Sequence, residues 1–555
     1  MNERPVSSIQ TSRALSNRHK KPRVRRALAA ASATVIATTG LVAATGAPAY
    51  AATIDITDVS GTLTDQYNTT GVEGADKAID NTPYLKYFTP NSTTWLQFQA
   101  ASPAVVTGYS ITSANDYPDR DPRDWIFEGS TNGTTWVTLD TRSNETFVAR
   151  YARKSYSFSN STAYAYYRLS ITGNAGSPHT QLAEWQIFGT TSATAPAPAA
   201  PTGLSAQVIS GDQIVLTWQD NTPWETHYRI ERSTDGVNWT WSRNLPAGTT
   251  RFRSIGLSGN TLYHFRVRAE NGTGVSSYAT VTATTDSPDL PTTWQEHWFE
   301  HVQEVTRKAY SSDVGVYFDD DMNPAALTWI NNLTTAVWQY TKQEYGSFSN
   351  PRLAAIFHEG KYGGGHPATV FDDSHDYRNV IDIGDSNWTA MTDWQRDVIL
   401  HEIGHIVEFG SHGVKNSPAF YLWGDSKWAE IFEYDVYVGL GLTADANRVY
   451  NSFINTVDNF PRANTYWFRD WFFPIWQNYG QTQALTNFFE LLAEHFHQYN
   501  GDYARDLNWG EFVHFWSGAA GVNLKPLATA AFGWDATWEQ QFIQAQLDFP
   551  GVTYA

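Results

Sequence analysis

The chain contains no cysteine among its 555 residues. This absence excludes disulfide scaffolds, thiol nucleophiles, iron–sulfur clusters and zinc sites built from thiolates. Stability must therefore come from buried side chains, or from metal ions held by oxygen and imidazole groups. Basic residues are scarce as well, with 38 Lys and Arg against 56 Asp and Glu. An acidic surface repels phosphates, so we expect no nucleic-acid partner.

Apolar and aromatic residues are abundant enough for several hydrophobic cores. Hydrophobic residues make up 41% of the chain and aromatic residues 15%. This composition is typical of globular proteins and differs from that of disordered chains. At roughly 100 to 200 residues per domain, the length predicts three or four domains.

Residues 1–51 have the pattern of a secretory signal peptide. Six basic residues between Arg18 and Arg26 precede an Ala/Val/Thr-rich run, and Ala49-Tyr50-Ala51 supplies a small-x-small cleavage site. The alternative is a membrane anchor, but the run is short and no second apolar run of spanning length follows. We expect a secreted, extracellular protein without a membrane span after processing. Its remaining 30 basic and 55 acidic residues give a net charge of −25.

Residues 53–190 show short alternating segments separated by Gly, Asn, Pro and Asp, which predicts an all-β sandwich. Several motifs in this range resemble a discoidin-like jelly roll of the family 32 carbohydrate-binding type: Ser113-Ala114-Asn115-Asp116, Arg120-Asp121-Pro122, Asp124-Trp125-Ile126-Phe127, Tyr167-Arg168-Leu169 and Leu182-Ala183-Glu184-Trp185.

The resemblance implies a glycan-binding module with a structural Ca2+ ion. Asp80 and Glu184 lie where the family places its calcium ligands, and carboxylate oxygens suit that ion. The simpler interpretation gives Asp80 a role in a turn and Glu184 a surface salt bridge. Sugar-contacting side chains are expected in loops, with Tyr117, Arg120 and Tyr87 as candidates. Each of these could instead be packed against its own domain.

A Pro/Ala-rich linker is expected at residues 191–201, followed by a second β-domain at 202–285. The runs Ile214–Trp218, Tyr228–Ser233 and Thr261–Ala269 resemble the strands of a fibronectin type III sandwich. In that resemblance Trp218 lies on an early core strand and Tyr263 occupies the tyrosine corner. We expect a spacer domain.

Residues 291–555 change to helical periodicity with a few strands. Apolar residues recur from Leu327 to Tyr340 at helical spacing, whereas Leu353–Phe357 and Val380–Ile383 indicate strands. Strand, helix, strand, edge strand and a long helix is the order of a zincin domain. The expected fold is therefore multidomain: a jelly-roll β-sandwich, a fibronectin type III β-sandwich, and an α+β zincin-like catalytic domain with a mostly helical C-terminal half.

The long helix is expected to carry the chemistry. Thr392 and Gln395 form a plausible capping box, and His401-Glu402-Ile403-Gly404-His405 follows on the same helix. Four residues of spacing bring the two imidazoles to one helical face, where both can bind a single Zn2+ ion. Glu402 lies beside the metal and can act as the catalytic base. The alternative is a solvated helical face with coincidental histidines.

Two histidines leave the zinc ion short of a third protein ligand. The metzincin pattern fails, because Glu408 and Ser411 occupy the places of its Gly and His. Glu430, in Trp428-Ala429-Glu430, resembles the downstream glutamate of gluzincins and is our choice. Glu433, one helical turn later, remains a rival ligand. Asp435 could orient a zinc-binding histidine, or could be a helix-surface acid.

The sequence therefore predicts a secreted zinc metallopeptidase that acts on proteins or glycoproteins, is targeted by a carbohydrate ligand, and is monomeric. Two alternatives remain: a non-catalytic carbohydrate-binding adhesin and, less favoured, a glycoside hydrolase. The residue that stabilises the transition state stays open among five candidates: His514, Tyr466, Arg469, His495 and His497.

Overall fold

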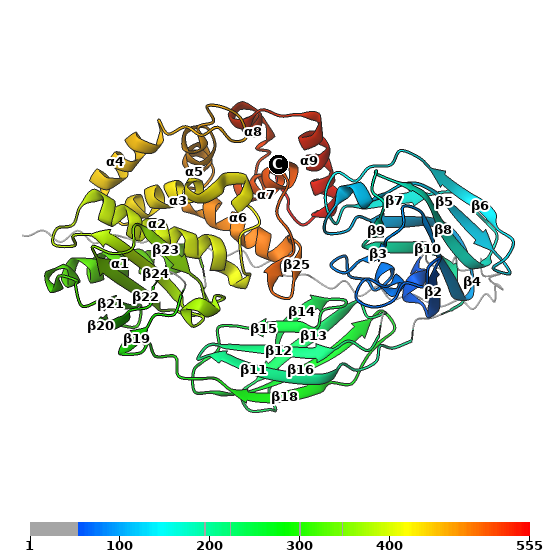
Figure 1. The fold of residues 1–555 in the computed structure, drawn as a ribbon, viewed down its shortest axis with the longest axis horizontal. Coiled ribbons are helices and arrows are strands. Elements are labelled where there is room, and N and C mark those ends of the chain that lie inside the picture. The colour runs from blue at the N-terminus through cyan, green and yellow to red at the C-terminus, as the bar shows by residue number, and fades with distance from the viewer. Residues whose placement is uncertain (1–53, 194–195, 223, 299–300, 347) are drawn as a thin grey trace, which may run out of the picture. The chain divides into compact units, whose positions relative to one another are not determined.

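The structure is a computed structural model that describes residues 54–193, 196–222, 224–298, 301–346 and 348–555 (Figure 1). The expected signal peptide at 1–51 lies outside the described residues, as do positions 194–195 of the expected linker. Within the described ranges, no helix combines the length and the apolar character needed to span a bilayer.

The first domain is an all-β sandwich, as the alternating segments predict. Its large sheet has the order β1-β10-β4-β8-β5-β6, with β2 and β7 also paired to β4, and β3 pairs with β9. The strands are β1 (Ile54–Asp55), β2 (Gly61–Asp65), β3 (Tyr87–Thr89), β4 (Thr94–Thr112), β5 (Pro122–Ser130), β6 (Val137–Arg142), β7 (Arg153–Ser157), β8 (Tyr164–Asn174), β9 (Thr180–Leu182) and β10 (Glu184–Thr191). Inward-facing aromatics, including Tyr109, Trp125 and Trp185, fill the core.

The second domain packs two antiparallel sheets, β11-β12-β15 and β14-β13-β16-β17, with β18 also paired to β16. The strands are β11 (Thr202–Ser210), β12 (Gln213–Gln219), β13 (His227–Ser233), β14 (Thr240–Pro246), β15 (Arg251–Ser254), β16 (Leu262–Asn271), β17 (Gly274–Val275) and β18 (Ala279–Thr284). Trp218 is buried, and the hydroxyl of Tyr263 accepts a hydrogen bond from the backbone N–H of Ser258 at 2.9 Å. This is the bond expected of a tyrosine corner.

The third domain begins with a six-stranded sheet of order β19-β20-β21-β22-β24-β23. The strands are β19 (Thr293–Gln295), β20 (Glu304–Tyr310), β21 (Val314–Phe318), β22 (Leu353–Glu359), β23 (Gly365–Ala368) and β24 (Asn379–Ser386). Strands β21, β22 and β24 are parallel, and β23 runs antiparallel to β24 at the edge. The strands and edge strand expected from the sequence are therefore present.

Helices make up most of the remainder of this domain, as expected. They are α1 (Leu327–Glu344), α2 (Asp393–Gly410), α3 (Phe420–Gly439), α4 (Thr443–Phe453), α5 (Phe473–Asn478), α6 (Thr482–His495), α7 (Trp509–Ala520), α8 (Lys525–Phe532) and α9 (Ala536–Asp548), with one π-helical turn at Phe468–Phe472 and a two-stranded ribbon, β25 (Gln498–Tyr499) and β26 (Asp502–Tyr503).

The two faces of the six-stranded sheet carry different cores. Along β22, Ala355 and Phe357 belong to the large core shared with α1, α2 and the C-terminal helices, whereas Ala354 and Ile356 face a smaller cluster with Trp294. This alternation follows from the two-residue period of a strand. The sheet therefore has a face toward α2 and an opposite face covered by a segment that contributes Leu290, Trp294, Trp298 and Val305.

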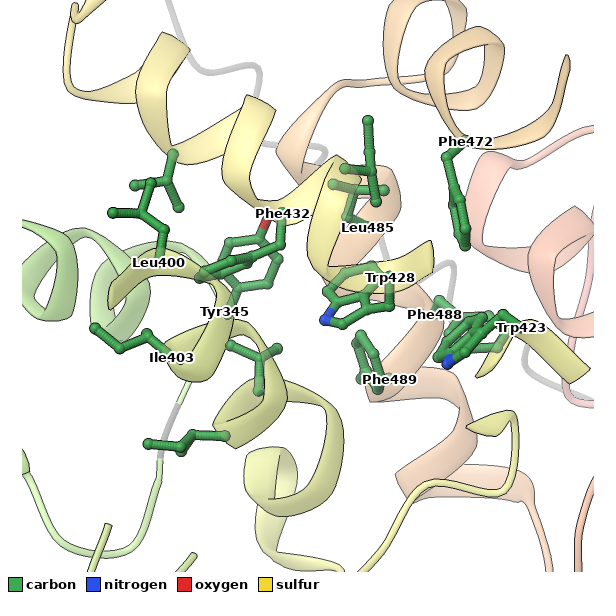
Figure 2. Packing of buried hydrophobic residues seen from close by; sticks show 14 of the residues in the cluster. Tyr345, Leu400, Ile403, Trp423, Trp428, Phe432, Phe472, Leu485, Phe488 and Phe489 are labelled. Carbon is green, nitrogen blue, oxygen red and sulfur yellow. The ribbon is translucent and has the colours of Figure 1, made fainter. Parts of the chain in front are cut away.

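Helix α2 packs closely against α3 because Gly404 has no side chain. A Cβ atom at Gly404 would lie 2.9 Å from the ring of Phe432, closer than side chains normally approach. The indole N–H of Trp428 donates to the Gly404 carbonyl at 3.2 Å. Figure 2 shows Trp428 and Phe432 together in this core, and Trp428 also meets Phe489 at a ring-centroid distance of 4.7 Å. These contacts fix the position of α3 beside the His-Glu-x-x-His motif.

Candidate metal centre

Two imidazoles converge on one face of α2. The helix begins with the expected capping box, in which Thr392 and Gln395 bond each other's backbone N–H groups. One turn apart, the Nε2 atoms of His401 and His405 lie 3.2 Å from each other, and the ring planes are nearly perpendicular at 83°. Two ligands of one tetrahedral zinc ion are separated by about 3.3 Å, given Zn–N bonds of about 2.0 Å. The pair therefore has the spacing of two ligands of one ion.

A carboxylate supports the opposite nitrogen of each ring. Nδ1 of His401 lies 3.3 Å from Glu433 Oε1, and Nδ1 of His405 lies 3.0 Å from Glu408 Oε2. A carboxylate at Nδ1 favours the tautomer with the proton on that nitrogen and the lone pair on Nε2. Both rings are thus held with Nε2 ready to coordinate a cation.

Glu408 is a residue that the sequence interpretation missed. Its side chain is buried, and its second oxygen accepts a hydrogen bond from the indole N–H of Trp423. Burial raises the pKa of Glu408, while the bond to His405 acts in the opposite direction. The available signal was its position three residues after His405, which places both side chains on the same helical face.

Glu402 lies between the histidines in sequence and beside the edge strand in space. It is buried, and a Cβ atom built on Gly365 of β23 would lie 2.7 Å from Glu402 Oε1. The absence of a side chain at Gly365 therefore lets the edge strand pass directly over this carboxylate.

Glu430 and Glu433 both project from buried positions of α3. Burial raises the pKa of Glu430 to about 8, while the charges of Lys427 and His401 act against this shift. Burial also raises the pKa of Glu433 to about 7, against its bond to His401. Glu433 contacts His401 at Nδ1, away from the Nε2 atoms that face each other. That contact suits a supporting carboxylate.

Asp435 does not orient either histidine, so that interpretation was wrong. Its carboxylate is buried on another side of α3 and accepts four hydrogen bonds, from Tyr340, Tyr345, Trp476 and Thr482, at 2.6 to 3.0 Å. Asp435 lies two residues after Glu433 on α3, which is a rotation of about 200° around the helix axis. The two side chains therefore point to different sides of the helix. Asp435 instead joins α1, α3 and the C-terminal helices.

Two further candidates are placed elsewhere by the structure. His514 is buried in the helical core, where it contacts the hydroxyl of Tyr554 at 2.9 Å. Tyr87 is fully buried on β3, and its hydroxyl donates to Asp65 at 2.9 Å. Because its ring faces the core of the sandwich, Tyr87 cannot stack on a sugar.

The expected calcium ligands of the first domain lie together. Asp80 and Glu184 are both buried, and one oxygen of Asp80 and both oxygens of Glu184 make no hydrogen bond. Burial raises the pKa of Asp80 to about 7, and burial together with the nearby Asp80 raises that of Glu184 well above its ordinary value. These buried carboxylate oxygens without hydrogen bonds suit a hard cation, and Lys77 Nζ lies 3.8 Å from Asp80 Oδ2 beside them.

Tyr117 and Arg120 also lie together, in the loop between β4 and β5 of the first domain. The ring of Tyr117 is 56% exposed, and the guanidinium carbon of Arg120 lies 3.8 Å from its centroid. Arg120 therefore covers one face of an exposed ring.

Comparison with known proteins covers separate parts of the chain. Residues 199–285 match the fibronectin type III domain family. A peptide-N(4)-(N-acetyl-beta-glucosaminyl)asparagine amidase of Arabidopsis thaliana is 38% identical over 87 residues, which are 15% of this chain and 12% of that protein. Human neogenin is 30% identical over 131 residues, covering 21% and 9% of the two chains. The chain thus spans about a tenth of the length of these curated relatives.

Among solved structures, the family 32 carbohydrate-binding module of Clostridium perfringens NanJ, in complex with galactose, is similar at 15% identity and a TM-score of 0.22. The alignment covers 25% of this chain and 99% of that module. The family match agrees with the strand pattern and the tyrosine corner described above. The chain therefore contains a fibronectin type III domain, as its sequence predicts.

Proposed function

We propose that this protein is a secreted zinc-dependent endopeptidase whose catalytic domain spans residues 291–555. The observation that supports this most is the pair of Nε2 atoms at 3.2 Å, each opposite a carboxylate-supported Nδ1 atom. Two imidazoles that face each other through the same nitrogen, each with a carboxylate at the opposite nitrogen, suit a shared cation.

The donor set fits zinc. His401 and His405 would hold the ion, with Glu430 as the proposed third protein ligand. Two imidazoles and one carboxylate are a common set in catalytic zinc sites, which keep one further position open. When bound, zinc supplies Lewis acidity that polarises a carbonyl group and lowers the pKa of water.

The chain's own residues then supply the proton transfers and the substrate position. The Glu402 carboxylate would take a proton from the attacking water and deliver it to the leaving amine. Strand β23 ends the described sheet and passes over Glu402, so an extended peptide could pair with its free edge and place its scissile bond there.

The first domain would direct the enzyme to its substrate. A glycan bound near Tyr117 and Arg120, in a module stabilised by Ca2+, would raise the local concentration of enzyme on a glycoprotein or on a glycan-bearing surface. We propose these features together: the peptidase activity, a protein substrate, a carbohydrate ligand and an extracellular location.

Digestion of casein and of a mucin by the purified chain tests this function. Glu402→Gln is expected to lower the rate of peptide cleavage by about 10² to 10⁴-fold, because a positioned general base contributes that much. The bound zinc and the circular dichroism spectrum should remain unchanged. Glu490→Gln, at an exposed position on α6, is the matched control and should cleave at the wild-type rate.

Three results would contradict the proposal. The first is full activity in the Glu402 variant, and the second is activity that persists after zinc is removed by a chelator. The third is release of sugars without peptide cleavage, which would favour a glycoside hydrolase. Glycan binding with no cleavage of any kind would favour an adhesin.

A further inference from the structure

A second cluster of metal-type side chains lies on the opposite face of the six-stranded sheet from α2. It contains Glu296, His301, His358 and Asp382, and one donor atom from each residue lies within 4.8 Å of all the others. All four are at most 2% exposed. His358 belongs to β22 and Asp382 to the neighbouring strand β24, whereas the other two belong to the segment that covers this face.

The distances within the cluster are those between ligands of one small cation. Nε2 of His358 lies 3.1 Å from Glu296 Oε1 and 3.3 Å from Asp382 Oδ1. Nδ1 of His301 lies 3.0 Å from Asp382 Oδ2. A tetrahedral ion with bonds of about 2.0 Å separates its ligands by about 3.3 Å.

These close approaches are not explained by hydrogen bonds. The five facing atoms are all buried, and none has a hydrogen-bond partner: Glu296 Oε1, His301 Nδ1, His358 Nε2, Asp382 Oδ1 and Asp382 Oδ2. Nε2 of His358 points between two carboxylates, Glu296 at 3.1 Å and Asp382 at 3.3 Å. A buried polar atom without a partner is costly, and a cation placed among these atoms would satisfy them together.

The outer atoms of the cluster are held by other groups, as is usual around a bound metal. Nδ1 of His358 forms a hydrogen bond with Asp319 Oδ2 at 3.0 Å, which leaves the Nε2 lone pair for a cation. Oε2 of Glu296 accepts a hydrogen bond from the backbone N–H of Gln303 at 3.2 Å, which leaves Oε1 facing inward. Two of the four side chains are therefore oriented with one donor atom toward the common centre.

Charge also favours a cation. Among the described residues, the ion-pair partners of Glu296 and Asp382 are histidines alone. With a cation bound, both imidazoles are neutral ligands, so the two buried carboxylates balance the charge of a divalent ion. We propose that Glu296, His301, His358 and Asp382 form a second metal site, separate from the His401 and His405 pair.

The chemistry of the donors points to zinc and to a structural role. Two nitrogen and two oxygen donors suit Zn2+, and four protein ligands with negligible exposure leave no open position for substrate. The ion would join the segment carrying Glu296 and His301 to strands β22 and β24. Its loss should loosen that segment, while the α2 pair keeps its own metal.

Metal analysis of the full chain tests this site independently of the proposed peptidase. Purified protein is equilibrated with Zn2+, desalted and measured by mass spectrometry for metal per chain. We expect two zinc ions in the wild type and one in the His401→Ala/His405→Ala double variant. Adding Asp382→Asn or Glu296→Gln to that double variant should remove the second ion. With Co2+ in place of zinc, the double variant should show visible absorption typical of a tetrahedral site.

His514→Gln is the matched control, because it removes a buried histidine from the helical half and should leave two ions. If Asp382→Asn does not fold, the double variant alone decides the question. A folded double variant without bound metal would overturn the second site. One wild-type ion that survives the double variant and is lost with Asp382→Asn would support this site and contradict the proposed peptidase centre.

Discussion

Glu408 and His405 form a buried pair on one face of α2, with Glu408 Oε2 3.0 Å from His405 Nδ1. The indole of Trp423 holds the other oxygen of Glu408. The orientation of the second histidine of the motif therefore depends on a residue outside the motif and on a tryptophan of α3.

Replacement of Glu408 should weaken the proposed zinc site without abolishing the fold. Glu408→Gln keeps an acceptor but removes the charge that supports His405, and such outer partners are commonly worth 10 to 100-fold in metal affinity. Competition with a zinc-binding chelator measures this change. Glu490→Gln should retain wild-type affinity. If Glu408→Gln and Glu490→Gln bound zinc with equal affinity, Glu408 would have no influence on the metal.

Tyr117 should contribute directly to carbohydrate binding. Arg120 covers one face of its exposed ring, so a sugar would stack on the other face. Tyr117→Ala should weaken binding to the best ligand of a glycan array by roughly tenfold, which corresponds to about 1.4 kcal/mol. Tyr67→Ala removes another exposed ring of the same domain and should have no effect. Unchanged binding after Tyr117→Ala would move the sugar site elsewhere.

Calcium should stabilise the first domain through Asp80 and Glu184. In zinc-saturated protein, Ca2+ at 100 times its Kd should raise the free energy of unfolding by about 2.7 kcal/mol, seen as a higher Tm by calorimetry. The Asp80→Asn/Glu184→Gln double variant should not respond to Ca2+. Asp119→Asn, at an exposed position, should respond as the wild type does. A Ca2+ response that persists in the double variant would exclude these two ligands.

Asp435 should matter for stability and not for metal content. Asp435→Ala leaves four donors without this acceptor, two of them on the buried residues Tyr345 and Trp476, and the expected loss is about 3 kcal/mol or more in the free energy of unfolding. Denaturation followed by tryptophan fluorescence measures it. Asp470→Ala, which removes a surface partner of Arg469, should change stability by less than about 1 kcal/mol. If a folded Asp435→Ala variant lost its zinc, Asp435 would influence the zinc-binding histidines after all, which would contradict this prediction.

Glu225 should make the stability of the fibronectin type III domain depend on pH. Burial, with a smaller contribution from Asp220, raises the pKa of Glu225 from 4.5 to about 8. The folded state then binds more protons than the unfolded state, so this contribution to stability is complete below pH 4.5 and is lost as pH rises to about 8. The slope is at most about 1.4 kcal/mol per pH unit.

Glu225→Gln should remove this slope, because its amide oxygen can still accept the Gly248 N–H and it carries no charge. Compared with the wild type, the variant should become relatively more stable with each step in pH from 5 to 8. Glu304→Gln, at an exposed position, should follow the wild type throughout. Parallel curves for the wild type and Glu225→Gln would contradict the shifted pKa.

Local rules were enough to predict many elements. The capping box of α2 and the strand positions at Leu353 and Val380 depend on neighbouring residues or on a short period, whereas the tyrosine corner was expected from the resemblance to fibronectin type III domains. The same rules could not assign Tyr87 or Asp435, because a side chain's direction is set by the neighbours that its element meets. Tyr87 was expected in an exposed loop and is buried on β3.

By itself the sequence predicted the strand and helix order of the third domain and the helical face that carries His401 and His405, because each depends on spacing along one segment. The fibronectin type III domain was expected from its resemblance to that family. Only the tertiary structure decided that Glu433 of α3 supports the ring of His401. It alone also brought together Glu296, His301, His358 and Asp382, which come from separate segments. Contacts of this kind follow from how distant segments pack, and no local pattern encodes them.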